Sequence, residues 1–164
     1  MTTICTDGRT VAADGKSCLG DRPVSLRTQK IVVSNGTLYA LSGPECMIRP
    51  IIEWWERGHD HATVPVAKDE GCAWTLMVID PGGTVIMTSR CQFPSPIPSG
   101  VFAIGSGADY AMGAMLAGKS PREAIAIASR CDVWTGGDIQ EVVIAEAVGW
   151  GVPNQYEPMD LVDA

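Results

Sequence analysis

The second residue of the chain is a threonine whose position could give it chemistry. The chain begins Met1-Thr2-Thr3. An initiator methionine is removed when the next residue is small, so we expect Thr2 to become the first residue of the mature chain. A terminal threonine carries a hydroxyl nucleophile and, on the same residue, a free amine that can take the hydroxyl proton. Thr2 is therefore a candidate nucleophile, although Met-Thr is a common start of cytosolic proteins.

Asp14 and Lys30 are charged residues in the first part of the chain, and their types alone do not assign them a role beside such a hydroxyl. A lysine ammonium close to a threonine hydroxyl lowers the pKa of that hydroxyl, and an aspartate can hold the ammonium in place. Each residue also has a simpler interpretation. Asp14 could be a turn residue before Gly15, and Lys30 could be a solvated end of a strand.

The elements that must position these residues begin with three predicted β-hairpins. Each hairpin has a turn signal between two short β-type segments, namely Asp7-Gly8, Asn35-Gly36 and Pro81-Gly82-Gly83. The segments are 2–6 with 9–14, 30–34 with 37–42, and 74–80 with 84–91, and a last strand is predicted over 141–147. Hairpins from separate parts of a chain favour antiparallel sheets packed face to face.

Three capping boxes predict the starts of three helices. They are Ser42 with Glu45, Ser106 with Asp109, and Ser120 with Glu123. The helices are expected to end near Arg57, Gly118 and Arg130. Residues 58–71 are polar and predict a loop, and 151–164 predict a C-terminal arm. The order of elements indicates one α+β domain over 1–164, an antiparallel β-sandwich flanked by helices.

Composition limits the function classes. The net charge is −7, and the 12 Lys and Arg are scattered, which argues against nucleic-acid and membrane partners. No segment resembles a signal peptide or a membrane span. The 6 cysteines form no CxxC pair and are expected to be reduced, as in a cytoplasmic protein. His59-Asp60-His61 lacks a third ligand, so no metal or other cofactor is expected.

Four stretches resemble one known family. They are TTICTDGRTVAADGKSCLG (2–20), TQKIVVSNGTLYALSG (28–43), FAIGSGADYAMGA (102–114) and SPREAIAIASRCDVWTGGDIQEVVI (120–144). Together they cover roughly half the chain, and they resemble the proteasome β-subunit family, particularly its bacterial HslV branch, in that family's order. The resemblance implies the four-layer αββα fold of the N-terminal-nucleophile hydrolases.

The resemblance also implies roles for individual residues. It assigns Thr2 as nucleophile with Asp14 and Lys30 as its partners. Ser106 and Asp132 match the residues that orient the terminal amine, and Gly43 matches the glycine whose N–H stabilises an oxyanion. The positions near the pocket for the substrate side chain before the cut are Ser17, Thr28 and Leu41.

The implied activity is that of a threonine-type endopeptidase, which cleaves peptide bonds through an acyl ester on Thr2 inside a self-compartmentalising homo-oligomer of stacked rings. Two alternatives remain open: an unprocessed, non-catalytic ring subunit, and an amidase of small substrates on the same fold. Two departures from the family are visible. The first hairpin is a few residues shorter, and no second long helix follows the first, so one helical layer is expected to be reduced. Whether an AAA+ unfoldase docks on that altered surface is left open.

Overall fold

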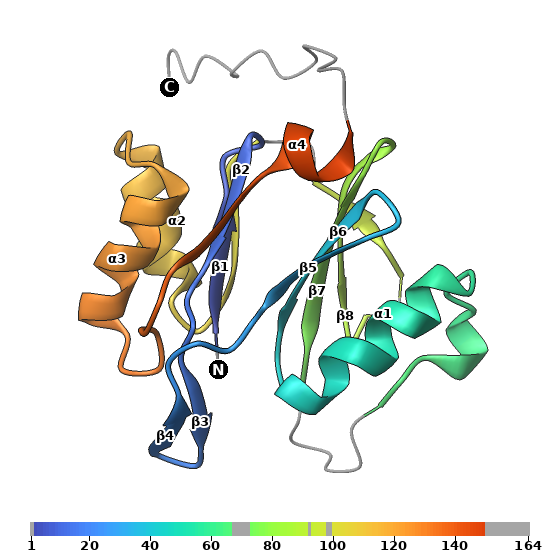
Figure 1. Cartoon of the computed structure of the whole chain (residues 1–164), viewed down its shortest axis with the longest axis horizontal. Coiled ribbons are helices and arrows are strands. Elements are labelled where there is room, and N and C mark those ends of the chain that lie inside the picture. The colour runs from blue at the N-terminus through green and yellow to red at the C-terminus, as the bar shows by residue number, and fades with distance from the viewer. Residues whose placement is uncertain (1, 67–72, 92, 98–99, 150–164) are drawn as a thin grey trace.

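The computed structural model describes residues 2–66, 73–91, 93–97 and 100–149. It has four layers, with helices outside two antiparallel sheets that face each other (Figure 1). The predicted α+β sandwich flanked by helices is therefore confirmed. Met1 and the predicted arm at 151–164 lie outside the described residues.

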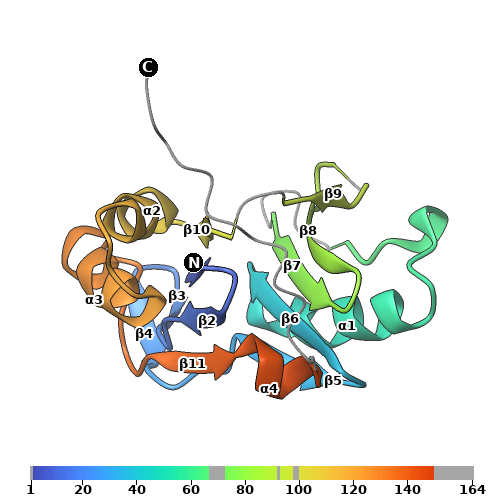
Figure 2. The same ribbon diagram turned by 90° about the horizontal axis from the view of Figure 1, so that it is seen from above.

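The first sheet contains the N-terminal hairpin between two late strands. Its order is β10-β1-β2-β11, and all its pairings are antiparallel. The strands are β1 (Thr3–Thr6), β2 (Thr10–Ala13), β10 (Phe102–Gly105) and β11 (Gln140–Val143). Helices α2 (Ala108–Leu116) and α3 (Pro121–Cys131) cover its outer face (Figure 2).

The second sheet is a meander of consecutive strands in the order β5-β6-β7-β8-β9. The strands are β5 (Ile31–Ser34), β6 (Thr37–Ser42), β7 (Thr75–Asp80), β8 (Gly83–Thr88) and β9 (Ser95–Pro96). Helix α1 (Ile48–Glu56) covers its outer face, between the 3₁₀ turns η1 (Glu45–Met47) and η2 (His61–Thr63).

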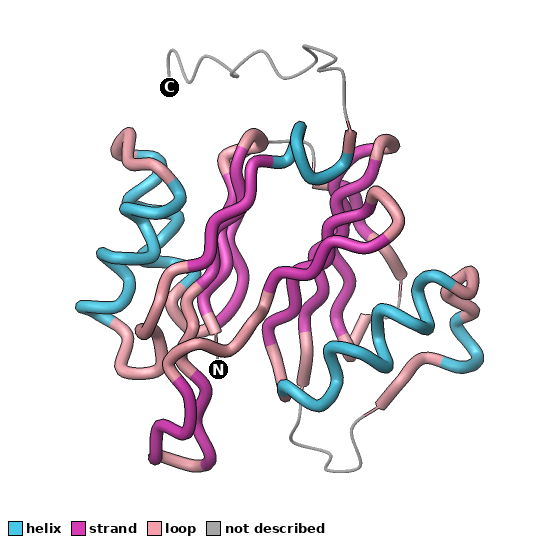
Figure 3. Tube along the Cα trace, viewed as in Figure 1, coloured by secondary structure: helices cyan, strands magenta, loops and turns pink. Residues whose placement is uncertain are grey.

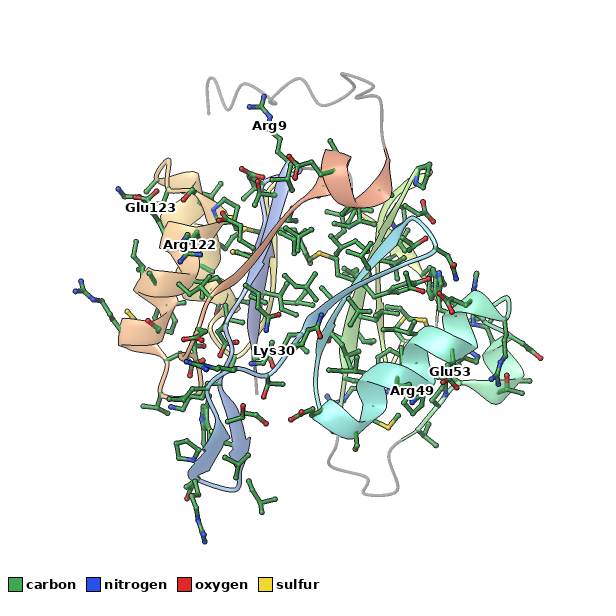
Figure 4. The ribbon with its side chains drawn as sticks, viewed as in Figure 1. Arg9, Lys30, Arg49, Glu53, Arg122 and Glu123 are labelled. Carbon is green, nitrogen blue, oxygen red and sulfur yellow. The ribbon has the colours of Figure 1, made fainter. Side chains whose placement is uncertain are left out.

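Alternation of apolar residues along the strands explains why two sheets form. In β6, Leu38 and Ala40 point into the core between the sheets, whereas Tyr39 and Leu41 pack with Ile51 of α1. Successive strand residues face opposite sides, so a strand that is buried on both faces reads as a continuous apolar run. The space between the ribbons is filled by these side chains (Figure 4).

All three predicted hairpins are present. Asn35 and Gly36 have φ of 50° and 71°, as a two-residue hairpin turn of the primed type requires. A further hairpin, which the sequence analysis missed, is formed by β3 (Ser17–Leu19) and β4 (Arg22–Ser25). It projects beside the start of β1 (Figure 3).

The prediction of one strand over 141–147 was partly wrong. The strand β11 ends at Val143, and Ile144–Val148 form the short helix α4. Ile144, Ala147 and Val148 all pack in the core between the sheets, a spacing of three and four residues that a helical turn permits and a strand, whose adjacent residues face opposite sides, does not. Helix α4 lies across one end of the sandwich, in contact with β6 and β7.

The predicted loop at 58–71 contains η2 in its described part. Cys5, Cys18, Cys46, Cys91 and Cys131 are free thiols, and Cys72 lies outside the described residues. None of the helices in the described ranges has the length and apolar character needed to cross a bilayer.

Candidate active site

Lys30 and Asp14 form a buried ion pair. Lys30 Nζ lies 2.8 Å from Asp14 Oδ1, and the two side chains are 4% and 0% exposed. Asp14 directly follows β2 of the first sheet, and Lys30 directly precedes β5 of the second. The predicted partnership of these two residues in space is therefore present in the structure. Figure 4 shows Lys30 at the seam between the two sheets.

The carboxylate of Asp14 also reaches the start of β1. Its Oδ1 accepts a hydrogen bond of 2.8 Å from the backbone N–H of Thr3. That N–H belongs to the peptide bond that joins Thr2 to Thr3, so one oxygen links the Lys30 ammonium to the backbone of Thr2. The other oxygen, Oδ2, accepts hydrogen bonds from the backbone N–H groups of Gly136 and Lys16 at 3.0 and 3.2 Å.

Gln140 of β11 fixes the segment that carries Lys30. Its Oε1 accepts from the backbone N–H of Lys30 at 2.9 Å, and its Nε2 donates to the carbonyl of Thr28. The ammonium of Lys30 also donates to the carbonyl of Lys16 at 2.7 Å. Contacts from the first sheet and from the carbonyl of Lys16 thus determine where the ammonium lies.

Burial changes the proton affinity of the Lys30 ammonium. Desolvation lowers the pKa of Lys30, and the charge and hydrogen bond of Asp14 offset only part of that change. The pKa of Lys30 is therefore lower than that of a solvated lysine. A lysine of lowered pKa beside a hydroxyl can stabilise an alkoxide and exchange protons more readily than a solvated one.

A second network lies behind Ser106. Ser106 follows β10, its backbone N–H donates to the carbonyl of Thr2 at 2.9 Å, and its hydroxyl donates to Asp132 Oδ2 at 2.6 Å. Thr135 donates to the same oxygen at 2.6 Å. A carboxylate only accepts, so the Thr3 hydroxyl, which lies 2.5 Å from that of Thr135, is the donor in that contact. The chain of hydrogen bonds runs from Thr3 through Thr135 to Asp132.

This network holds Asp132 ionised. Desolvation raises the pKa of the Asp132 carboxyl, but hydrogen bonds from Ser106, Thr135 and the backbone of Trp134 together lower it below its ordinary value. Because the hydroxyl of Ser106 donates its hydrogen bond to Asp132, its oxygen is left with lone pairs that can accept from an amine.

One cavity of about 410 Å³ lies over both networks. Its wall contains seven of the residues that the resemblance implied, and Asp14 and Asp132 lie directly behind two of them, Lys30 and Ser106. The seven are Thr2, Ser17, Thr28, Lys30, Leu41, Gly43 and Ser106. Thr2 itself is only 2% exposed.

Two glycines allow the backbone to approach closely at this cavity. Gly43 has φ of 153°, and a Cβ atom there would lie 2.7 Å from the Cβ of Trp74. Gly105 has φ of 101°, and a Cβ atom there would overlap the carbonyl oxygen of Thr2. Within the described residues the N–H of Gly43 donates to no acceptor, which leaves it available to a ligand.

Two of the three predicted capping boxes were wrong. Ser42 ends β6 and pairs with Thr75, so it caps no helix, and Glu45 instead accepts from the hydroxyl of Ser17. Ser106 gives its hydroxyl to Asp132, and Gly107 is the N-cap of α2.

Several site residues were missed. Thr3, Thr135, Lys16 and Gln140 hold the candidate residues, yet each acts through a partner that is distant in the sequence. For Thr3 its place directly after Thr2 was a signal in the sequence. Among the described residues no group of three His, Cys, Asp or Glu could hold a metal ion. His59 stacks on Trp55 with ring centroids 4.3 Å apart.

Comparison with solved structures places this fold. Thiobacillus denitrificans BPH, a proteasome homologue, is similar over 87% of this chain and 96% of its own, with 19% identity and a TM-score of 0.66. The chain has the proteasome β/HslV fold. The same BPH in complex with epoxomicin gives 18% identity and a TM-score of 0.67, with 87% and 97% of the chains covered.

HslV from Trypanosoma brucei is similar as well. It covers 87% of this chain and 99% of its own, with 20% identity and a TM-score of 0.65. No protein-family model and no curated protein sequence matches the chain. At these identities the likeness shows the fold, and the chemistry has to be argued from the residues.

Proposed function

We propose that the chain is a threonine-type endopeptidase subunit that cleaves peptide bonds through an acyl ester on Thr2, after removal of Met1. The observation that carries the proposal is the position of Asp14 Oδ1. It binds the buried ammonium of Lys30 and the amide that follows Thr2, directly behind the wall of a cavity large enough for a substrate side chain.

Each residue then has a defined part in the reaction. The Thr2 hydroxyl attacks the substrate carbonyl carbon, and its proton passes to the free amine of Thr2. The new oxyanion accepts a hydrogen bond from the N–H of Gly43. The tetrahedral intermediate collapses to an ester, the leaving amine takes the proton, and water hydrolyses the ester to free the enzyme.

The two carboxylates support these steps without touching the substrate. Asp14 holds the Lys30 ammonium, whose charge favours the ionised form of the Thr2 hydroxyl. Asp132 accepts a hydrogen bond from the hydroxyl of Ser106, so that the oxygen of Ser106 can accept from the Thr2 amine and orient it. The role of Asp132 requires the amine of Thr2 to be free.

The proposed setting is a closed ring in the cytoplasm. A peptidase of broad action is safe among other proteins only when its sites are enclosed, and a cyclic homo-oligomer achieves this. Native mass spectrometry tests this part: a stacked ring is expected, and a monomer at micromolar concentration would exclude compartmentalised proteolysis. An AAA+ unfoldase is a candidate partner. The test is whether degradation of folded substrates requires an added unfoldase.

The decisive experiment combines mass and labelling. Intact mass is expected to show the loss of one methionine, and a peptide epoxyketone such as epoxomicin is expected to add to the N-terminal peptide at Thr2. Thr2→Ala should abolish both labelling and peptide turnover. Undiminished turnover in this variant would exclude Thr2 as the nucleophile.

The same experiment separates the alternatives. Retention of Met1 with no labelling would indicate a non-catalytic ring subunit. Loss of Met1, with turnover of simple amides but not of peptides, would indicate an amidase of small substrates.

A further inference from the structure

The charges around the cavity beside Thr2 are not balanced. Among the described residues two cations, Lys16 and Lys30, line it, and both are engaged elsewhere. The ammonium of Lys30 is paired with Asp14, and the ammonium of Lys16 donates to the carbonyl of Val133 at 2.5 Å. The carbonyl does not cancel the charge of Lys16, but that charge also interacts with the carboxylate of Asp132, so each ammonium has a carboxylate near it other than Glu45.

Within the part of the chain that the structure describes, Glu45 is the acidic residue on the cavity wall. It begins η1, is exposed, and accepts a hydrogen bond of 3.1 Å from the hydroxyl of Ser17, which lines the same wall. Among the described residues Glu45 has no cationic partner within ion-pair distance. A carboxylate can accept several hydrogen bonds, and one from Ser17 leaves most of that capacity unused.

Thr28 provides a second polar group at the same wall. It is 6% exposed, and its hydroxyl has no hydrogen-bond partner among the described residues. A buried hydroxyl without a partner is unfavourable. Since it has no hydrogen bond to lose, rotation about χ1 can turn it toward a donor that enters the cavity.

We propose that this cavity receives a basic substrate side chain, lysine or arginine, whose charge is recognised by Glu45 and one of whose N–H groups is accepted by Thr28. The inference rests on the proposed function, because it takes the side chain to be the one before the cut. It adds the class of substrate, which the fold does not supply. The volume of about 410 Å³ is sufficient for a long side chain.

Binding to a variant that cannot react tests the inference independently of catalysis. In the Thr2→Ala background, four fluorescein-labelled peptides that differ only in the last residue are compared by anisotropy. The last residues are arginine, citrulline, leucine and glutamate. Citrulline has the shape of arginine without the charge. Arginine is expected to bind about fivefold more tightly than citrulline in low salt, and glutamate most weakly.

The charge preference should depend on Glu45. Glu45→Gln is expected to bring the ratio of arginine to citrulline close to unity, and raised salt should do the same in the parent protein. Glu53→Gln is the matched control, because Glu53 lies on α1 and pairs with Arg49 outside the cavity. The ratio of arginine to citrulline binding should not change in this variant.

The hydroxyl of Thr28 has its own test. Thr28→Val keeps the shape and removes the hydroxyl, so arginine and citrulline should both lose about threefold in affinity while leucine does not. Equal binding of arginine and citrulline to the parent, tighter binding of glutamate, no binding of any peptide, or an arginine preference that survives Glu45→Gln would each overturn the inference.

The two proposals fail in different ways. Labelling of Thr2 without a preference for arginine would support the proposed peptidase activity and overturn the proposed specificity for basic side chains. A preference for arginine without labelling of Thr2 would support the proposed site for basic side chains and overturn the proposed peptidase activity.

Discussion

The ammonium of Lys30 and the backbone N–H of Thr3 bind the same oxygen, Asp14 Oδ1, each at 2.8 Å. The two donors come from different sheets, since Thr3 starts β1 and Lys30 precedes β5. Asp14 therefore fixes the distance between the ammonium and the first residues of the chain. Perturbing this shared acceptor should affect stability and chemistry together.

Lys30→Met should lower both stability and reactivity. It leaves the charge of Asp14 buried without a cation, so the free energy of unfolding should fall by about 3 kcal/mol in urea titrations. The rate of epoxyketone labelling at Thr2 should fall by at least about a hundredfold. Lys119→Met is the control, because Lys119 and Glu123 form an exposed pair with side chains 49% and 54% accessible. It should change neither quantity measurably. Normal labelling of Lys30→Met would remove Lys30 from the mechanism.

Gly105→Ala should displace Thr2. A Cβ atom at Gly105 overlaps the carbonyl oxygen of Thr2, and φ of 101° is unfavourable for alanine. Stability should fall by more than about 1 kcal/mol, and labelling should slow. Gly113→Ala is the matched control in α2, where nothing lies within 4 Å of the added methyl group. It should raise stability by about 0.5–1 kcal/mol with labelling unchanged.

Asp132→Asn should change how the free energy of unfolding depends on pH in the acid range. The pKa of Asp132 lies below its ordinary value in the folded protein, since its hydrogen bonds outweigh desolvation. A carboxyl with a depressed folded pKa stabilises the fold above its unfolded pKa, and that contribution is lost as pH falls through the folded pKa. The difference in unfolding free energy between parent and Asp132→Asn should therefore shrink as pH is lowered from about 5 to 2. A difference that is constant over this range would contradict the assigned network.

Ser120→Ala should weaken the start of α3 alone. The hydroxyl of Ser120 accepts from the N–H of Glu123, and the Glu123 carboxylate accepts from the N–H of Ser120. Loss of the cap should cost about 1 kcal/mol without a change in labelling. Ser129→Ala, in the same helix, removes a hydroxyl that donates only to Ala126 within its own turn and should cost less. Equal losses of stability in the two variants would contradict the assignment of Ser120 as the cap of α3.

Local features were predictable from the sequence. The turn at Asn35-Gly36 is decided by two adjacent residues that tolerate positive φ, and the capping box at Ser120 by residues three apart. The same box pattern at Ser42 failed because that residue continues β6 opposite Thr75. A pattern of four residues does not record a strand partner more than thirty residues away.

The candidate site was predictable only in part, and for the same reason. Lys30 and Asp14 were found through a family resemblance, which carries spatial information that spacing lacks. The chain of hydroxyls through Thr3 and Thr135 joins residues at opposite ends of the sequence. Gln140 holds the Lys30 segment across 110 residues. Their side chains look like ordinary surface or strand residues until the fold brings them together.

The position of Lys30 at the seam between the two sheets determines how the protein loses its reactive arrangement on unfolding. Its ammonium and its backbone N–H are held by Asp14 and Gln140, which belong to the opposite sheet. No fragment that keeps one half of the sandwich can keep the reactive arrangement, however well that half folds. Heating should therefore extinguish activity along the same curve as the loss of tertiary structure, with no partly active species in between.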